Sequence, residues 1–478
     1  MSRLASLFSV EKMVPARLRH GELPSTKSAY QDVMKIALPS VIEMVLLSLV
    51  SSVDIIMISS LGPAAIAAVG LTGQPRMLML SIFSALNVGV TAVVARRRGQ
   101  DAPDKANQVL RNALVVITLL SVTLTAIVLP LSEKLMYLFG AKEDTAALAA
   151  SYYRIVFYVF PLNAIVLCIN AAQRGVGNTR VALYSNIVSN VINIFFNYLL
   201  IGGHWGFPAL GVDGAAIGTL LGFVGSFFVS VYSITSKKSI GSFLHLSRHD
   251  NWRLHKESLQ AVSKVGGNAM VEQVALRIGF SLYAFFIADL GTLAFAAHQI
   301  CSQFLNFSFS FGDGLAVAGT SLVGQMLGQK RPDLSLMYGK VTQRMSLLVS
   351  IGLASFIVLF RYPLVGLFVE SETTNPQDIA QVTQMAVQLM LVVAVFQLPQ
   401  TSSVVISGAL RGAGDNLFVA GIMLICVTII RPVFTFFSIK VLGLGLIGAW
   451  GASLIDMTVR LLFVYRRFNS GKWFTIQV

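Results

Sequence analysis

The chain has 478 residues, of which 55% are hydrophobic and only 12% are charged. A soluble domain carries roughly a quarter charged residues, so this composition excludes a soluble surface and makes lipid the natural solvent. The net charge of +14 indicates basic cytoplasmic loops rather than nucleic-acid binding, because Lys and Arg gather in such loops of membrane proteins.

Runs of about 20 apolar residues recur along the whole chain and predict twelve membrane-spanning helices. In chain order they are expected at 34–60, 64–95, 107–130, 146–172, 180–202, 213–235, 260–288, 292–327, 341–360, 381–409, 417–439 and 445–467. Several exceed the minimal length, which indicates tilted or bent helices. The expected fold class is therefore all-α and polytopic.

The connections between these spans alternate in charge. Arg96-Arg97-Arg98, Lys330-Arg331 and Arg466-Arg467 lie in basic connections, whereas the turns at 133–144 and 204–213 are acidic or neutral. The positive-inside rule then predicts both termini in the cytoplasm and a multi-pass protein of the plasma (inner) membrane. The first 30 residues are polar and basic, so no signal peptide is expected there.

The second half of the chain repeats the first. A shift of 229 residues aligns 43–111 with 272–340 without a gap and places Glu43 on Glu272 and Asp54 on Tyr283. Farther on, Arg-Gly-x-Gly recurs at 174 and 411, and Gly-x-x-Gly-Ala recurs at 211 and 445. Each half has an even number of spans, so the halves are expected to be parallel six-helix repeats around a central cavity.

This repeat predicts two lobes, at 1–240 and 259–478, joined by a basic cytoplasmic linker at 241–258. Two parallel lobes that rock about a cavity suit a secondary transporter better than a duplicated scaffold without transport. A receptor or channel on the same scaffold is a further alternative.

Catalytic and nucleotide-binding motifs are missing from the sequence. It holds no GxxxxGK[ST] loop and no HExxH or GxSxG motif, so we expect neither an enzyme nor a cofactor. His298 is expected to be a structural hydrogen-bonding residue, and Cys168, Cys301 and Cys426 to be buried free thiols.

Polar side chains at membrane depth mark candidate sites, because charge in lipid is costly. Asp54 lies in the outer half of the first span, and Asn186, Asn190, Asn193 and Asn197 form one stripe on the fifth. Thr219 of the sixth span is expected at the depth of Asp54, Asn193 and Asn197. These oxygens suit Na⁺ or a proton on the carboxylate, although a polar network that holds helices together is the alternative.

A second set of polar side chains could line a substrate cavity. It comprises Glu43, Glu272, Gln299, Gln303, Asn306, Asp313, Gln397 and Gln400. Glu272 and Asp313 could attract a cationic substrate, or they could form internal ion pairs, for example with Arg277 or Arg431. Some of the many Phe side chains could stack on flat cations.

Several segments resemble the multidrug and toxic compound extrusion (MATE) family of the MOP superfamily. They are Ser52-Val53-Asp54 through Leu61-Gly62 to Ala67-Ala68-Val69-Gly70-Leu71, Ala296-Ala297-His298-Gln299-Ile300, Leu322-Val323-Gly324-Gln325 and both Arg-Gly-x-Gly turns. The resemblance covers nearly the whole chain in order. It implies antiport that is coupled to Na⁺ or H⁺ and exports cationic or amphipathic organic compounds.

The resemblance also assigns residues. Asp54 matches the family's first-helix acid, while Asn193 and Asn197 match an Asn-x-x-x-Asp pair whose second acid is Asn here. Glu272 matches a seventh-helix glutamate, but Gln400 stands where some members carry a tenth-helix acid. Coupling is therefore expected at Asp54, with Na⁺ or H⁺ left open.

Other functions and partners follow from the same features. A flippase or exporter for a lipid-linked or dedicated metabolite precursor is the nearest alternative. A flippase would need a large cationic groove at membrane depth, and arginine is scarce within the predicted spans. The expected partners are a small organic substrate and membrane lipid, with no nucleic acid, for a monomeric protein.

Overall fold

The computed structural model describes the chain except for residues 1–6, 60, 237–241, 248–249, 370–375 and 477–478. Every regular element among the described residues is helical. The chain divides into two compact units, which we call the C-terminal unit (Met1–Val41 with Asn268–Val478) and the N-terminal unit (Ile42–Gly267). The helices α3 and α10 each run from one unit into the other.

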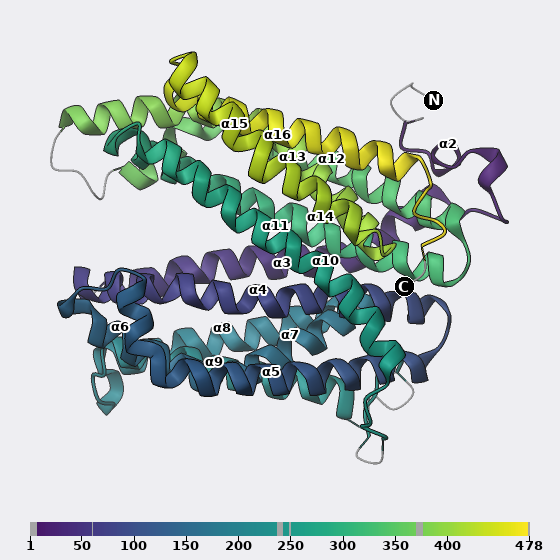
Figure 1. Ribbon diagram of the computed structural model, residues 1–478, viewed down its shortest axis with the longest axis horizontal. Coiled ribbons are helices and arrows are strands. Elements are labelled where there is room, and N and C mark those ends of the chain that lie inside the picture. Colours follow the sequence, from purple (N-terminus) through teal and green to yellow (C-terminus); the bar gives the residue numbers. More distant parts are fainter. Residues whose placement is uncertain (1–6, 60, 237–241, 248–249, 370–375, 477–478) are drawn as a thin grey trace. The chain divides into compact units, whose positions relative to one another are not determined.

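Long helices make up each unit (Figure 1). The first half of the chain contains α3 (Thr26–Ser59), α4 (Pro63–Gly99), α5 (Pro103–Leu138), α6 (Glu143–Tyr158), α7 (Phe160–Gly175), α8 (Thr179–Gly202) and α9 (Val212–Thr235). The second half contains α10 (Lys256–Ala288), α11 (Thr292–Gly328), α12 (Pro332–Val369), α13 (Pro376–Gly412), α14 (Asn416–Ile425), η4 (Cys426–Ile430), α15 (Arg431–Phe436), η5 (Phe437–Val441) and α16 (Gly445–Asn469).

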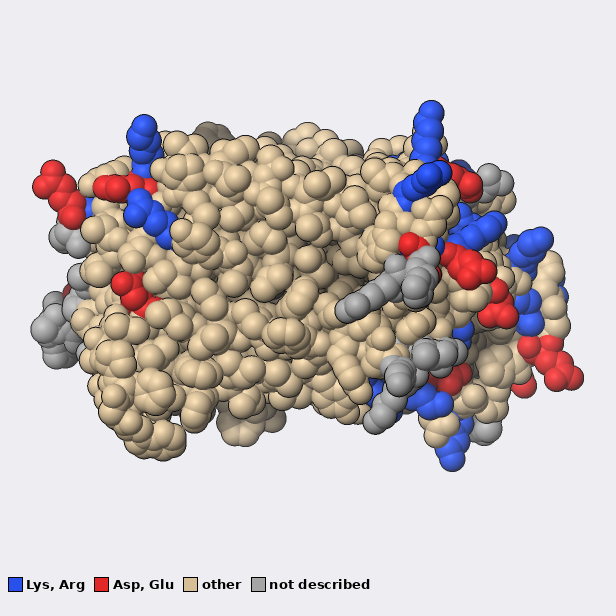
Figure 2. Space-filling model, turned by 90° about the horizontal axis from the view of Figure 1, so that it is seen from below, with Lys and Arg blue, Asp and Glu red and all other residues tan. Residues whose placement is uncertain are grey.

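The membrane-spanning segments agree with the twelve that the sequence predicts. Among the described residues, ten helices are long and apolar enough to cross a membrane, and the bent pair α6–α7 makes an eleventh segment if it is counted as one span. The helix α11, of 37 residues, corresponds to the remaining expected span, and Gln, Asn, Ser and Asp recur along it. On the face shown in Figure 2, charged side chains gather toward two opposite ends and leave a broad uncharged surface between them, as lipid requires.

Two irregular points in these helices lie beside a proline. The helices α6 and α7 meet at an angle of 51°, directly before Pro161, which cannot continue a hydrogen-bond ladder from the preceding turn. In the eleventh span, Pro432 follows the π turn η4, which loosens the ladder where the proline lacks its N–H.

Each half of the chain contains an equivalent hydrogen bond between two helices that are far apart in the sequence. Thr91 of α4 donates its hydroxyl to the carbonyl of Ala171 in α7 at 3.0 Å. The repeat-related Thr320 of α11 donates to the carbonyl of Gly408 in α13 at 2.8 Å. The repeat seen in the sequence is therefore also a repeat of packing.

Glycine of the Arg-Gly-x-Gly turns permits this close approach. A Cβ added at Gly175 would lie 2.8 Å from the Thr91 carbonyl oxygen, and a Cβ at Gly412 would lie 2.1 Å from the Thr320 carbonyl oxygen. Both distances are shorter than any van der Waals contact. The glycines thus act in helix packing, in addition to the tight turns for which the sequence suggested them.

The described N-terminal segment packs on the C-terminal unit. Val10 and Met13 of α2 (Val10–Met13) are buried in a core with residues of α11 and α12. Lys340 donates to the Met13 carbonyl at 2.9 Å, and the backbone N–H of His20 donates to Asp333 at 3.0 Å. The C-terminal unit therefore includes the residues up to Val41. The predicted first lobe, 1–240, groups these residues with the first half of the chain instead.

Asp333 also ties the N-terminal segment to the start of α12 through Arg331. The guanidinium of Arg331 contacts both carboxylate oxygens of Asp333, at 3.0 and 2.9 Å, and donates to the Glu22 carbonyl at 3.2 Å. The hydrogen bond to Asp333 raises the pKa of Arg331 above its usual range. This corner of the C-terminal unit is held by charge-assisted contacts.

The predicted linker contacts the helix α5 at several of its described residues. Asn107 of α5 donates to the Phe243 carbonyl at 3.3 Å and accepts from the His245 N–H at 3.0 Å. Arg111 forms an ion pair of 3.0 Å with Asp250. Positions 241, 248 and 249 of the expected linker lie outside the described residues.

The helix contact at Gly412 is testable by adding one methyl group. Gly412→Ala puts a Cβ against the backbone of Thr320, so the helices must separate, and we expect a loss of about 1–3 kcal/mol of stability. Gly421→Ala is the matched control, because open space surrounds Gly421 of α14. Thermal unfolding in detergent checks both variants; equal midpoints would contradict the role of Gly412.

Candidate functional site

Asp54 lies at the centre of a polar cluster in the N-terminal unit. Its Oδ1 accepts a hydrogen bond of 3.0 Å from the side-chain amide of Asn197. In the amide orientation that satisfies both of its polar atoms, Asn193 donates to the same oxygen at 2.8 Å and accepts from the Thr219 hydroxyl at 3.1 Å. The four residues that the sequence predicts as one site therefore lie together.

Three helices position these side chains. Asp54 stands near the end of α3, while Asn193 and Asn197 are one turn apart on α8 and both are buried. Thr219 comes from α9. The neighbouring Gly218 leaves room for the Asn197 side chain, because a Cβ at Gly218 would lie 2.1 Å from the Asn197 side-chain oxygen. Residues far apart in sequence thus converge because α8 and α9 pack tightly together.

The cluster has the oxygen atoms that an alkali cation uses. Asp54 supplies a carboxylate, Thr219 supplies a hydroxyl, and the side-chain oxygen of Asn197 is buried without a hydrogen-bond partner. Na⁺ accepts such hard oxygens as ligands. The two amide N–H groups that point at Asp54 stabilise its carboxylate, and rotation of those amides would turn oxygens toward a cation.

Sequence reasoning missed Arg76 and Tyr152 at this site. Arg76 of α4 lies within electrostatic range of Asp54, and its guanidinium stacks over the Phe223 ring at 5.5 Å. Tyr152 of α6 lies beside Thr219 and is also within range of Asp54. Arg76 could have been found, because it is a charged residue inside the predicted span 64–95. Tyr152 gives no comparable signal.

Glu43 and Glu272 are partners of the Arg-Gly-x-Gly arginines. In the N-terminal unit the Glu43 carboxylate pairs with Arg174 and accepts from Asn186 at 2.7 Å. In the C-terminal unit Glu272 pairs with Arg411. The alternative of an internal ion pair applies to Glu272, but its partner is Arg411 rather than Arg277 or Arg431.

The remaining predicted cavity residues fall into two groups within the C-terminal unit. Gln299, Gln303, Asn306 and Asp313 of α11 are exposed along one face of the helix. Gln397 and Gln400 of α13 are fully buried, and both amide atoms of Gln400 lack a hydrogen-bond partner. The α11 face is thus open to a ligand, whereas the α13 pair is part of the interior.

A different cluster stands in the C-terminal unit where the repeat would place a second ion site. Tyr283 replaces Asp54, and in the register of the Gly-x-x-Gly-Ala motifs Ser453 falls on Thr219. Tyr283 is buried, and Arg431 lies over its ring at 5.5 Å. The nearby carboxylate of Asp456 faces Arg431.

Asp456 holds two arginines inside the C-terminal unit. Its Oδ2 accepts from Arg431 at 2.7 Å and from Arg460 at 2.9 Å. All three side chains are at most 3% exposed. Asp456 lies near the middle of α16, so two cations and one anion are buried at membrane depth. Sequence reasoning considered Arg431 only as a partner of Glu272 or Asp313.

Removal of the Asp456 charge should destabilise the protein strongly. Asp456→Asn leaves Arg431 and Arg460 buried without a counter-charge, which costs about 3–5 kcal/mol. The control Asp289→Asn breaks the exposed pair with Lys440, and we expect at most about 1 kcal/mol there. Chemical denaturation or thermal unfolding in detergent measures both. A mild effect of Asp456→Asn would mean that the arginines find other partners.

The chain is similar in sequence to known bacterial transporter proteins over most of its length. The chain is 29% identical over 449 residues to a probable multidrug resistance protein NorM of Thermotoga maritima, covering 93% of each chain. It is 26% identical to the uncharacterized transporter YisQ of Bacillus subtilis, covering 86% of this chain and 87% of the relative.

Solved structures show the same fold. One is described as the outward-facing conformation of a multidrug resistance MATE family transporter of the MOP superfamily; its TM-score is 0.85 at 22% identity, covering 93% of this chain and 97% of that one. Another, a MOP superfamily transporter from Pyrococcus furiosus described as having a binding pocket of reverse polarity, has a TM-score of 0.84 at 22% identity with the same coverage.

The MatE family model matches residues 39–199 and 269–437. These two stretches make up more than half of the chain and correspond to the two repeats. The prediction of a transporter rather than an enzyme is confirmed by this match. The chain belongs to the MATE family of membrane transporters.

Proposed function

We propose that this transporter exports cationic or amphipathic organic compounds in exchange for Na⁺ or H⁺ that binds at Asp54. The observation that carries the proposal is the cluster of Asp54, Asn193, Asn197 and Thr219. A carboxylate held by neutral amides can gain a proton or a cation, whereas one held by arginine is already neutralised. Several relatives are named probable multidrug resistance proteins, which supports drugs as substrates.

The exposed face of α11 supports a cationic substrate. Gln299, Gln303 and Asn306 offer amide groups, and Asp313 adds one carboxylate on the same face. Neutral amides with a single acid can bind a polar cation without strong preference for its shape. This combination suits a broad range of organic cations and equally a single metabolite.

A cation-selective exporter fits the described residues better than a flippase for anionic lipid-linked precursors. Such a flippase needs accessible cations at membrane depth. Arg431 and Arg460 are buried and share the Asp456 carboxylate, so they offer no open cationic groove. Arg76 is half-buried and faces Phe223 and Asp54.

Coupling requires that the ion favours one state of the transporter. A ligand shifts two states only by its different affinity for them. We infer that the cation at Asp54 breaks the amide contacts from α8 and so changes how α3 and α8 pack.

We further propose that both termini lie in the cytoplasm and that the protein acts as a monomer in the plasma membrane, without a cofactor.

Loss of the Asp54 carboxylate is the first test. Asp54→Asn keeps the size and the hydrogen bonds of the side chain but removes the titratable charge, so we expect normal membrane insertion and loss of ion-driven dye export by at least tenfold. Proteoliposomes with imposed Na⁺ or pH gradients measure it. Asp289→Asn, at an exposed pair, is the control and should retain export. Full ion-driven export by Asp54→Asn would sink the proposal.

Arg76 provides a second test of the ion site. Its charge opposes a cation at Asp54, so Arg76→Gln should raise the apparent affinity for the coupling cation several-fold. Arg154→Gln removes a more exposed arginine of the same unit and should leave the affinity unchanged. The measurement is the Na⁺ or H⁺ concentration for half-maximal export. An unchanged value in Arg76→Gln would place the ion elsewhere.

A further inference from the structure

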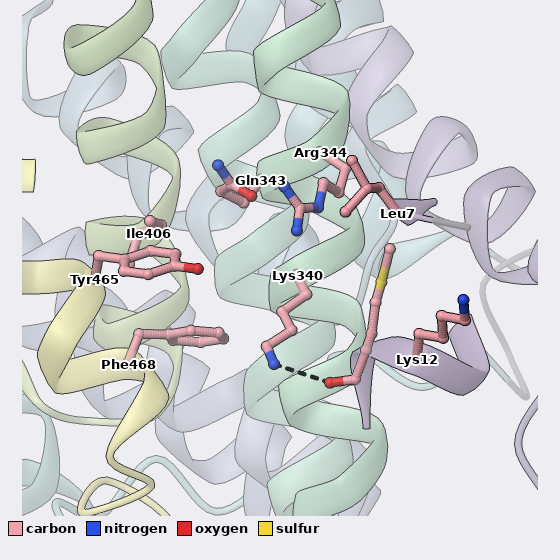
Figure 3. A pocket seen from close by; sticks show the side chains of 9 residues that line it. Leu7, Lys12, Lys340, Gln343, Arg344, Ile406, Tyr465 and Phe468 are labelled. Atoms are coloured by element: carbon pink, nitrogen blue, oxygen red, sulfur yellow. Dashed lines mark hydrogen bonds between the residues drawn. The ribbon is translucent and has the colours of Figure 1, made fainter. Parts of the chain in front are cut away.

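A small cavity lies between the N-terminal segment and the helices α12 and α16 of the C-terminal unit. Its volume is about 150 Å³, whereas a water molecule takes about 30 Å³ of liquid volume, so the cavity can hold a small polar group. Figure 3 shows Lys340, Gln343 and Arg344 of α12, with Tyr465 and Phe468 of α16 to one side and the N-terminal segment to the other. Lys340 fixes that segment through its hydrogen bond to the Met13 carbonyl.

The cavity is cationic. Lys12, Lys340 and Arg344 line it, and none of its nine lining residues is acidic. Lys340 and Arg344 stand one helical turn apart and repel each other electrostatically. The Nε atom of Arg344 is buried without a hydrogen-bond partner, and so is the hydroxyl of Tyr30 nearby.

The buried Nε donor of Arg344 lacks an acceptor in this site. A phosphate group carries several strong acceptor oxygens and negative charge, and Arg and Lys are the side chains that bind it best. Gln343 and Tyr465 supply further polar atoms on the cavity wall. A single phosphate would therefore satisfy the buried donor of Arg344 and reduce the repulsion between the two cations.

The rest of the wall is apolar and is formed by Leu7, Met13, Ile406 and Phe468. The helix α12 has 38 residues and is about 57 Å long at 1.5 Å per residue, whereas the hydrocarbon core is about 30 Å thick. Lys340 lies about 12 Å along α12 from the first residue of that helix. With α12 centred in the bilayer, Lys340 is at the level of the lipid headgroups. The cavity thus combines cations with apolar surface where phosphodiester groups are concentrated.

We propose that this cavity binds the phosphate of an anionic ligand, supplied by a phospholipid headgroup or by a soluble phosphate compound. Bound phosphate ties the N-terminal segment, through Lys12, to α12, through Lys340 and Arg344. The site is separate from the Asp54 cluster and stabilises the protein independently of transport.

The test uses the purified full-length protein in detergent. Thermal unfolding is followed while phosphatidylglycerol, phosphatidylcholine with the same acyl chains, or inorganic phosphate is added. We expect phosphatidylglycerol to raise the midpoint by several degrees more than phosphatidylcholine. Lys12→Met and Arg344→Gln should each weaken the apparent affinity about fivefold, since a basic residue near a membrane surface contributes about 1 kcal/mol.

Arg361→Gln is the matched control, because Arg361 is a half-buried arginine toward the other end of α12. Lys12 is exposed, so Lys12→Met keeps the fold even if Arg344→Gln does not. Protection by inorganic phosphate alone would assign the site to a soluble phosphate compound. If neither phosphatidylglycerol nor phosphate protects, or if Arg361→Gln weakens binding as much as both cavity variants, the proposal is overturned.

Discussion

Charge placed in lipid needs a partner, and this constraint organises the whole protein. Moving an isolated charge to the centre of a bilayer costs a few kcal/mol or more. Glu43, Glu272 and Asp456 each meet an arginine, so they are neutralised parts of the scaffold. Asp54 instead accepts hydrogen bonds from neutral amides and has Arg76 only at longer range. The partner therefore separates Asp54, the carboxylate that we propose exchanges ions, from those that hold helices together.

Much of this arrangement could be predicted from sequence, because hydrophobic runs fix the spans and the repeat fixes the order of helices. The cluster at Asp54 followed from helical spacing and depth alone. The partners of Glu43 and Glu272 did not, although the Arg-Gly-x-Gly turns repeat along with them. Pairing of Glu43 with Arg174 depends on how α3 meets α7, and sequence periodicity says nothing about which helices touch.

Two features were invisible for other physical reasons. The N-terminal segment is too short and polar to predict a docking place, yet its buried Met13 and its backbone carbonyl are used by α12. The buried pairs of Asp456 combine an i,i+4 contact to Arg460 with a long-range contact to Arg431. Spacing along α16 suggests the first contact, but only three-dimensional packing produces the second.

The contact between Thr91 and Ala171, repeated at Thr320 and Gly408, has a consequence for how duplicated transporters diverge. It joins helices through a small hydroxyl, backbone carbonyls and neighbouring glycines, and leaves the larger side chains unconstrained. Each half can therefore change its polar interior without losing its frame. One half holds a buried carboxylate between neutral amides while the other holds one between two arginines, so a repeated scaffold carries different chemistry in its two halves.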